Sequence, residues 1–443
     1  MTEITSPEAA TVATLLQRGM SAHQAGDFRA ALEAYRGVLE LDPRNADALH
    51  LAGLLHAQHG STALAQQLIE AALEVLPDEP LYNNNLGNLH VECGRAELAL
   101  ASFQRAYAAA PERPDICNNL AVMLSRAGRA EEAERLFGQV LAAVPGFDDA
   151  RQNLANHLLR RGHIQQAVQT CIDGLLIAPR NRHLRRILGA AYVSVDMRAE
   201  AEALYRAWLA DEPDSAEAHF KLAALTQSDV PLRAPDRFVT AIFDTFAHSF
   251  DAKLAQLGYR APELVAEAVA RHASAPAATL DVCDAGCGTG LCGPLLKPWA
   301  RWLAGVDLSE GMLLKAQRRG VYDDLTVAEL VAYLEARPAA FDLIVSADTL
   351  CYFGALHDFA AAAQAALRSA GLLVFTVEAH ADDPGEPDFR LHGHGRYSHR
   401  PSYVAGALAA AGLELLEQQA VVLRMEAGQP VAGRLVTARR AAG

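Results

Sequence analysis

Apolar and polar positions in the first half of the chain repeat every 34 residues. Each unit holds two segments with apolar residues at helical spacing, a glycine between them and a proline after the second. This pattern predicts two helices per unit, with the glycine in the turn and the proline ending the second helix. The repeated positions are Gly26, Gly60, Gly94, Gly128, Gly162 and then Asp196; Ala31, Ala65, Ala99, Ala133, Ala167 and Ala201; and Pro43, Pro77, Pro111, Pro145, Pro179 and Pro213.

Each predicted helical pair also carries a small residue placed for close helix contact. A Leu-Gly or Leu-Ala pair stands in the first helix, as at Gly87, and a large residue follows the alanine of the second helix by four positions, as at Phe103. This arrangement resembles the tetratricopeptide repeat, in six units over residues 12–215. The amphipathic stretch at 215–227 resembles the capping helix of such solenoids, so we expect an all-α solenoid over residues 12–228.

Asparagines stand in one register of three consecutive first helices and suggest a binding groove. The concave surface of such solenoids commonly binds proteins or peptides. A side-chain amide donates and accepts hydrogen bonds at once, which suits a peptide backbone. The pattern is similar to the asparagine ladder in the repeats of O-linked N-acetylglucosamine transferases; the alternative is that these amides only cap and bridge neighbouring repeats. The residues are Asn85, Asn119 and Asn153, with Asn88 and Asn156 one turn further along.

The second half of the chain loses this period and alternates short apolar runs with helical stretches. This alternation predicts a parallel sheet with crossover helices. We expect strands at 279–284, 302–306, 325–328, 341–346 and 371–377, and a C-terminal antiparallel hairpin at 413–422 and 431–438. The expected fold is an α/β doubly wound, Rossmann-like domain of seven strands over residues 243–443, joined to the solenoid by a proline-containing linker at 229–242.

A glycine-rich turn, VCDAGCGTGLCG at 282–293, follows the first predicted strand. In doubly wound folds, ligands bind where such a turn leaves the strand, and glycines let the backbone approach them closely. The dinucleotide pattern fails because Leu291 stands where its third glycine is required. A phosphate-binding P-loop is excluded because no Gly-Lys-Ser/Thr follows. The turn has instead the form Asp-x-Gly-x-Gly-x-Gly, with Asp284, Gly286, Gly288 and Gly290.

This turn resembles motif I of class I S-adenosylmethionine-dependent methyltransferases. Further segments similar to that family, in the same order, are AGVDLSEGML at 304–313, FDLIVSADTLCYF at 341–353 and LRSAGLLVFTVE at 367–378. The resemblance implies S-adenosylmethionine as cofactor, with Asp284 near its ammonium and the glycines beside its methionine portion. It also implies Asp307 on the ribose hydroxyls, Leu308 over the adenine and Glu329 at the adenine amino group. The alternative for the three acids is a helix cap or a surface position.

The segment before the turn, residues 243–265, resembles the lead-in of a predicted proteobacterial methyltransferase group that also carries tetratricopeptide repeats. In related enzymes such a lead-in folds over the cofactor, which makes Tyr259 a candidate lid residue. The alternative for its helically spaced phenylalanines is ordinary core packing.

Methyl transfer is an in-line displacement that needs orientation and, for some acceptors, a base. Polar residues after the fourth and fifth strands are candidates to meet the acceptor, and the insertion FRLHGHGRYSHRPSY at 389–403 is expected to form a lid. Arg396 in this insertion is a candidate to hold an acceptor carboxylate. Its histidines lack an acidic or cysteine partner at a recognised metal spacing, so we expect no metal. The candidate catalytic residues are Asp348, Tyr352, Tyr397 and His399.

The 443-residue chain has a formal net charge of −14, and no basic cluster offsets it. This charge argues against nucleic acid and anionic membranes as partners. The seven cysteines are scattered, and neither a signal-peptide pattern nor an apolar run of bilayer length is present. We therefore expect a reduced, cytoplasmic protein.

These patterns together favour an S-adenosylmethionine-dependent methyltransferase whose repeats bind a protein or peptide. The alternative is a non-catalytic tetratricopeptide-repeat scaffold with an inactive methyltransferase-like domain, and the intact Asp284 and Asp307 count against it. A nicotinamide-dependent oxidoreductase is a third hypothesis, weakened by Leu291. The residues indicate neither the methyl acceptor nor the partner of the repeats.

Overall fold

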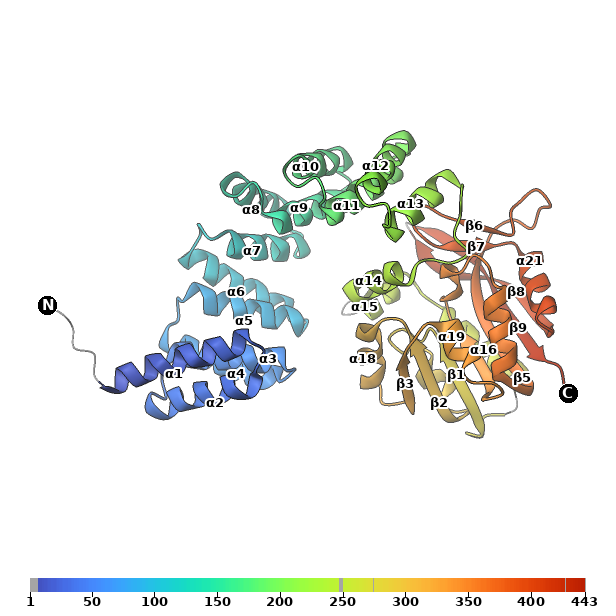
Figure 1. Cartoon of the computed structure of the whole chain (residues 1–443), viewed down its shortest axis with the longest axis horizontal. Helices are drawn as coiled ribbons and strands as arrows, with labels where there is room; N and C mark the ends of the chain where they lie inside the picture. Colours follow the sequence, from blue (N-terminus) through green and yellow to red (C-terminus); the bar gives the residue numbers. More distant parts are fainter. Residues whose placement is uncertain (1–6, 247–249, 274, 427, 443) are drawn as a thin grey trace. The chain divides into compact units, whose positions relative to one another are not determined.

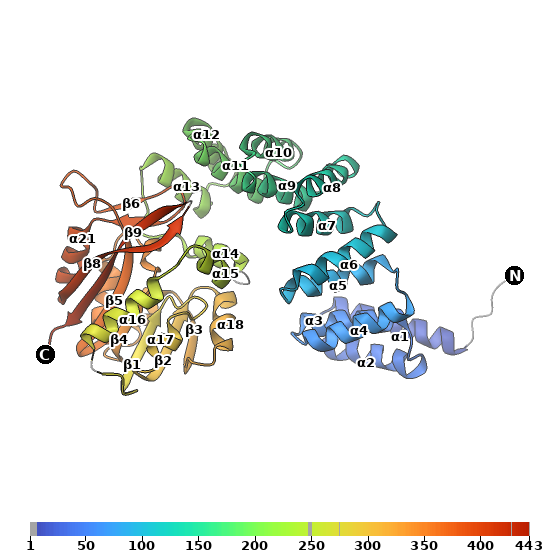
Figure 2. The same cartoon turned by 180° about the vertical axis from the view of Figure 1, so that it is seen from behind.

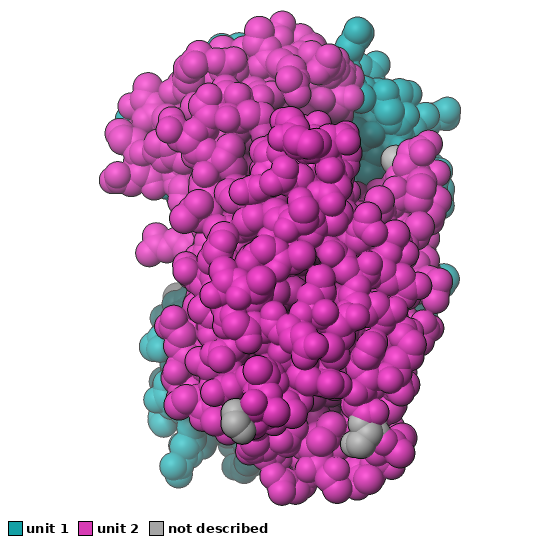
Figure 3. Space-filling view, turned by 90° about the vertical axis from the view of Figure 1, so that its right-hand side faces the viewer, with its two compact units in different colours: residues 1–191 teal, residues 192–443 magenta. Residues whose placement is uncertain are grey.

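The structure is a computed structural model that describes residues 7–246, 250–273, 275–426 and 428–442. It divides into two compact units, Met1–Ala191 and Tyr192–Gly443, which are coloured separately in Figure 3. The first unit is helical where it is described, and the second combines helices with one nine-stranded sheet.

Helical pairs follow one another along the first part of the chain (Figure 1). The turn glycines of the pairs have φ between 72° and 78°, a left-handed conformation that glycine adopts readily. Asp196 takes the same position in the last pair, with φ 56°. The helices are α1 (Pro7–Gln24), α2 (Phe28–Leu41), α3 (Ala46–Gln58), α4 (Thr62–Val75), α5 (Pro80–Glu92), α6 (Ala96–Ala109), α7 (Pro114–Arg126), α8 (Ala130–Ala143), α9 (Asp148–Arg160), α10 (Ile164–Ile177), α11 (Arg182–Ser194), α12 (Arg198–Asp211) and α13 (Ala216–Thr226).

The repeated positions of the sequence form the interior of these pairs. All six repeated alanines are fully buried, and the large residues four positions later are at most 2% exposed. At Gly87 an added Cβ would come within 2.6 Å of the Phe103 ring. Small residues at this position therefore let the two helices of a pair meet. The six predicted pairs and the predicted capping helix, α13, are confirmed.

The sheet of the second unit has the parallel order β3-β2-β1-β4-β5; β9 then runs antiparallel to β5, and β8 antiparallel to β9. The strand order reverses between β1 and β4, the place where doubly wound folds bind ligands. The predicted strands and C-terminal hairpin are confirmed, and the short β6 and β7 are additional. The strands are β1 (Leu280–Ala285), β2 (Ala300–Asp307), β3 (Asp324–Val327), β4 (Phe341–Ser346), β5 (Leu367–Ala379), β6 (Phe389–Leu391), β7 (Tyr397–His399), β8 (Leu413–Glu426) and β9 (Gln429–Arg440).

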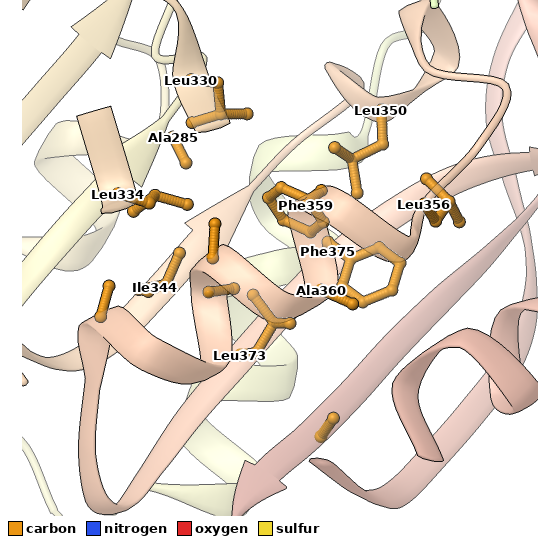
Figure 4. Close-up of a cluster of buried hydrophobic side chains, with 14 of the residues drawn as sticks. Ala285, Leu330, Leu334, Ile344, Leu350, Leu356, Phe359, Ala360, Leu373 and Phe375 are labelled. Carbon is orange, nitrogen blue, oxygen red and sulfur yellow. The ribbon is translucent and has the colours of Figure 1, made fainter. Parts of the chain in front are cut away.

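Alternate strand residues belong to core layers on opposite faces of the sheet. In β1, Val282 packs in the layer of α16 and α17, and Cys283 in the layer of α19, α20 and α21. Figure 2 shows α16 on the near side of the sheet. In the other layer, Phe359 and Phe375 meet edge to face with ring centroids 6.0 Å apart (Figure 4). These helices are α16 (Ala261–His272), α17 (Gly293–Leu296), α19 (Leu330–Glu335), α20 (His357–Ala366) and α21 (Pro401–Ala410).

Three more helices flank the site, α14 (Asp236–Phe246), α15 (Phe250–Gln256) and α18 (Glu310–Arg318). The predicted linker at 229–242 is thus helical from Asp236, because apolar residues there, including Phe238, find a buried surface. No helix in the described ranges is both long enough and apolar enough to cross a membrane.

Candidate functional site

A pocket of ≈ 260 Å³ opens at the carboxyl ends of β1, β2 and β4, where the strand order reverses. Its lining comes from the glycine turn, the residues after β2, β3 and β4, the helices α14 and α15, and strand β8. Seven predicted site residues line it: Gly286, Gly288, Asp307, Leu308, Glu329, Asp348 and Tyr352. Four others are not part of the lining: Asp284, Gly290, Tyr397 and His399.

The first two glycines of the turn differ in what surrounds them. The amides of Gly286 and Cys287 donate to the carbonyl of Val306 at 2.8 and 3.0 Å, which fixes the turn against β2. Gly286 has φ 78°, and an added Cβ would overlap the side chain of Thr349. Gly288 has φ 54°, and an added Cβ would meet no protein atom within 4 Å. Gly288 therefore leaves open space in the wall of the pocket.

Gly290 has a packing role instead. An added Cβ would lie 2.8 Å from the Tyr322 ring and 3.1 Å from the Ala316 Cβ of α18. The motif predicts Gly290 beside the cofactor, whereas in the structure its missing side chain makes room for Tyr322. A glycine in the sequence indicates that another group comes close to the backbone, but it does not indicate whether that group is a ligand or a side chain.

Asp284 is fully buried at the end of β1. The Tyr322 hydroxyl donates to its Oδ2 at 2.6 Å, and its Oδ1 has no hydrogen-bond partner among the described residues. Burial raises the pKa of Asp284 to about 7, with a smaller contribution from the charge of Asp307. A buried carboxylate with an unpartnered oxygen is suited to pair with a cation.

Asp307 ends β2 and faces the pocket. Its Oδ2 accepts from the Gly288 amide and its Oδ1 from the Ser309 amide, both at 2.9 Å. Burial raises the pKa of Asp307, and these backbone hydrogen bonds oppose the rise. The carboxylate thus joins the glycine turn to the start of α18 and keeps lone pairs for a ligand.

Leu308 and Glu329 line the pocket next to this turn. The carboxylate of Glu329 caps α19, accepting from the amides of Val331 at 3.1 Å and Ala332 at 2.8 Å. It also accepts from Arg233 Nη1 at 2.5 Å. These bonds support the helix-cap alternative for Glu329, although its side chain remains at the pocket surface.

Two acids that no sequence motif marks bind the lead-in helices to the turn. Asp244 of α14 accepts from the Ser309 hydroxyl at 2.5 Å. Asp251 of α15 accepts from the Thr289 hydroxyl and from Arg319 Nη2, the latter at 2.5 Å. Both helices line the pocket, as does the predicted lid residue that follows them, Tyr259.

Five charged side chains form a network where β4, β5 and β8 meet the pocket. Arg424 donates through Nη1 to both oxygens of Asp348, at 3.0 and 2.7 Å, and through Nη2 to Glu378. Its Nε donates to Glu426 at 2.7 Å. Arg396 donates to Glu378 at 2.7 Å and to Glu426 at 2.6 Å. Burial raises the pKa of Asp348 to about 6, although the charge of Arg424 opposes the rise.

The sequence motifs point to Asp348 and Arg396 but not to Arg424 and Glu426. An arginine inside the largely apolar run VVLRME of β8 is the only signal for this pair. The guanidinium of Arg396 is committed to Glu378 and Glu426, which argues against the expectation that it holds an acceptor carboxylate.

Two candidate catalytic residues have structural partners instead. Tyr397 is fully buried, and its hydroxyl donates to the carbonyl of Pro231 at 2.7 Å. His399 is fully buried, with Nε2 2.8 Å from the carbonyl oxygen of Phe353. Both residues belong to β7, which pairs with the end of β5. Their positions therefore argue against a catalytic role for Tyr397 and His399, and this part of the 389–403 insertion extends the sheet rather than forming a lid.

One group of possible metal ligands exists within the described ranges: Asp348, Cys351 and Glu378, whose ligand atoms lie within 4.8 Å of one another. Both carboxylates are ion-paired with Arg424. The Cys351 thiol donates to the carbonyl of Asp348 at 3.2 Å. The carboxylates of this group are thus engaged in the ion-pair network of Arg424 and Arg396.

In the first unit, the asparagines of the predicted ladder bridge neighbouring repeats. The bonded pairs are Asn85 Nδ2 with His50 Nε2 at 2.9 Å, Asn119 Nδ2 with Asn84 Oδ1 at 3.0 Å and Asn153 Nδ2 with Asn118 Oδ1 at 3.1 Å. Asn88 and Asn156, one turn further along, are exposed. The bridging alternative thus has direct geometric support, and the carbonyl groups of the three ladder amides keep lone pairs for a ligand.

Comparison with known families identifies both parts of the chain. The model of a family described as a methyltransferase domain matches residues 256–418. Two families described as tetratricopeptide repeats match residues 22–89 and 124–191, and residues 81–113. The chain therefore carries tetratricopeptide repeats followed by a methyltransferase domain.

Individual proteins show more limited similarity. Methyltransferase-like protein 27 of Homo sapiens is 37% identical over 89 residues, which are 20% of this chain and 36% of that protein. The chain thus spans about a third of the length of this relative. Among solved structures, MamA is 22% identical over 37% of this chain and 90% of its own, with a TM-score of 0.34. PilF of Pseudomonas aeruginosa is 20% identical over 48% of this chain and 97% of its own, with a TM-score of 0.42.

Proposed function

We propose that this chain is a class I S-adenosylmethionine-dependent methyltransferase of the type seen in a predicted proteobacterial group with N-terminal tetratricopeptide repeats. The observation that carries the proposal is the pocket at the strand reversal, where open space at Gly288 adjoins the carboxylate of Asp307. The methyltransferase-domain match over residues 256–418 supports it independently.

The residues of the pocket fit S-adenosylmethionine in several respects. The space at Gly288 admits a ligand close to the backbone. Asp307, at the end of β2, keeps lone pairs for the ribose hydroxyls, and Leu308 offers apolar surface to the adenine. Asp284 lies outside the lining, at the end of β1, and its buried, unpartnered Oδ1 is our candidate partner for the ammonium group. Glu329 is the weakest of the set, because it already caps α19 and pairs with an arginine.

S-adenosylmethionine supplies a methyl group bound to a positively charged sulfur. The residues of the chain contribute orientation and the exclusion of water, since Phe243, Phe250 and Tyr352 line the pocket with aromatic surface. Asp348, with a pKa of about 6, is ionised at neutral pH and is our candidate base for an acceptor proton. In its network two guanidinium groups face three carboxylates, and this balance favours a neutral or cationic acceptor over an anionic one.

We propose in addition that the repeats bind a protein or peptide through the asparagine register. The ladder amides Asn85, Asn119 and Asn153 would act as acceptors, because their Nδ2 groups bridge the repeats. The exposed Asn88 and Asn156 keep both donor and acceptor groups available.

Ligand-induced thermal stabilisation tests the proposed cofactor. A ligand at about a hundred times its Kd should raise the unfolding midpoint of the second unit by on the order of 5–10 °C. Asp307→Asn should remove most of this shift, because it weakens acceptance from the ribose and from the Gly288 amide. The matched control is Asp323→Asn, which also removes a carboxylate that accepts a backbone amide, that of Leu303 at 2.8 Å. Asp323 precedes β3 and so lies at the amino ends of the parallel strands, opposite the end at which the pocket opens.

The control variant should keep the full shift with S-adenosylmethionine. Absence of any shift in the wild type would contradict the proposal and favour the alternative of a non-catalytic repeat scaffold. An equal shift in Asp307→Asn would contradict the role given to Asp307 alone.

A further inference from the structure

The segment that joins the capping helix to the methyltransferase domain is paired with the wall of the pocket. This segment, residues 228–235, runs between α13 and α14. The carbonyl of Leu232 accepts from the amide of Gly354 at 2.8 Å. The amide of Ala234 donates to the carbonyl of Tyr352 at 2.8 Å. The backbone that carries Tyr352 is thus held by the chain leaving the repeats.

The capping helix itself packs on the β6–β7 hairpin. Phe220 of α13 is fully buried, with its ring centroid 4.9 Å from that of Phe238 and 6.1 Å from that of Tyr397. Gly395 of the hairpin has φ 90°, and an added Cβ would lie 3.2 Å from the Phe238 ring. We name the buried residues here the cap cluster: Phe220, Ala223, Ala224, Ala234, Phe238, Val239, Leu391 and Tyr397.

Two side-chain hydrogen bonds fix the same contact. Gln227, at the end of α13, donates from Nε2 to the carbonyl of Leu391 at 2.8 Å. Tyr397 donates from its hydroxyl to the carbonyl of Pro231 at 2.7 Å. Each bond joins the hairpin to the end of the solenoid or to the segment after it. The hairpin is therefore held by apolar packing and by polar bonds to backbone carbonyls, which are costly to leave unpaired when buried.

These contacts lead directly to the pocket. Tyr352 lines the pocket, and its backbone is one of the groups bound by the joining segment. Arg396 lines the pocket too, and it directly precedes Tyr397 of the cap cluster. Two members of the cluster, Ala234 and Val239, are themselves part of the lining.

We propose that the capping helix α13 is a positioning element of the methyltransferase pocket, which holds Tyr352 and Arg396 in place through the cap cluster. The end of the solenoid is then part of the unit that forms the site and not a detachable recruitment module. The division of the chain agrees, because the compact unit that contains the pocket begins at Tyr192, before α12 and α13. The inference rests on the proposed function only for its ligand readout.

Hydrogen exchange of the full chain, followed in peptides covering 347–355 and 389–399, tests this proposal. Phe220→Ala should lower protection in both peptides by on the order of a hundredfold, because it removes the central ring of the cap cluster. Phe220→Leu, which keeps an apolar side chain, should restore most of the protection. Tyr397→Phe keeps the ring and loses one hydrogen bond, so its effect should be about tenfold or less.

The control is Phe137→Ala, which truncates an equally buried aromatic side chain of α8, in the first unit. It should leave exchange in both peptides unchanged. Unchanged exchange in Phe220→Ala, or an equal loss of protection in Phe137→Ala, would overturn the proposal.

Stabilisation by S-adenosylmethionine gives a second readout on the same variants. Phe220→Ala should weaken ligand binding at least tenfold, whereas Phe137→Ala should leave it unchanged. Unaltered ligand affinity in a folded Phe220→Ala would show that α13 does not position the pocket. If the wild type itself binds no S-adenosylmethionine, the proposed function fails, and the exchange data still decide the role of α13.

Discussion

Three residues of the site have positive φ values, which are unfavourable for most residues and common at binding sites. Gly286 and Gly288 have positive φ, and only Gly288 opens onto free space. Asp348 has φ 56° without being a glycine, at the end of β4 where its carboxylate meets Arg424. Such a conformation costs on the order of 1 kcal/mol and persists only where the surroundings hold it. Here the Asp348 amide donates to the Thr376 hydroxyl at 2.8 Å, and its carboxylate accepts from Arg424.

The buried Asp284 should make stability depend on pH. Its folded pKa of about 7 lies well above the ordinary aspartate value, so the folded state binds more protons than the unfolded state between about pH 4 and pH 7. This residue therefore lowers stability as pH rises through that range. Asp284→Asn should raise the free energy of unfolding at pH 8 by on the order of 2 kcal/mol, and change it little near pH 3. Chemical denaturation of the chain without ligand at both pH values measures this.

Asp323→Asn provides a control of opposite sign. A hydrogen bond from Lys297 lowers the pKa of Asp323, so its stabilisation is present above the ordinary aspartate pKa and is lost as pH falls through the lower folded value. This variant should be less stable than the wild type at pH 8. A lower stability of Asp284→Asn than of the wild type at pH 8 would contradict the assignment of a costly buried charge.

At the scale of elements, the asparagine register joins neighbouring repeats. Asn119→Ala leaves the buried Oδ1 of Asn84 without its donor, which should cost about 1–3 kcal/mol of stability. Asn88→Ala, on the same face but exposed, should change stability by less than about 0.5 kcal/mol. Denaturation midpoints of the two variants decide the matter. Equal midpoints would show that the bridge contributes nothing.

The elements themselves are largely predictable from the sequence, for local reasons. The repeats are predictable because a small residue, such as Gly87, recurs at the same position of each unit, and the 34-residue period places the same helix contact there. The short β7 escapes prediction because it depends on pairing with β5 through Glu378 and Ser398, and it has little pattern of its own. The helical conformation of α14 within the predicted linker has no strong local signal, because the surface that buries Phe238 comes from α13 and the hairpin.

At the scale of the whole chain, some site residues are predictable from local motifs, whereas others reach the site from distant segments. Asp307 and Gly288 are predictable, because they stand at strand ends that a local motif marks. Tyr322, Asp251 and Arg424 are not, because they reach the site from segments 38 to 76 residues from their partners. Single-sequence patterns carry no information on such pairings.

The central claim is that the pocket binds S-adenosylmethionine against the glycine turn. Calorimetric titration of this ligand into the wild type and Gly288→Ala tests it most directly. Alanine at a left-handed position costs about 1 kcal/mol, and its methyl meets no protein atom, so the variant should fold. We predict one site per chain with micromolar affinity in the wild type, weakened at least about a hundredfold in Gly288→Ala. No heat with the wild type, or equal affinity in the variant, would contradict the account.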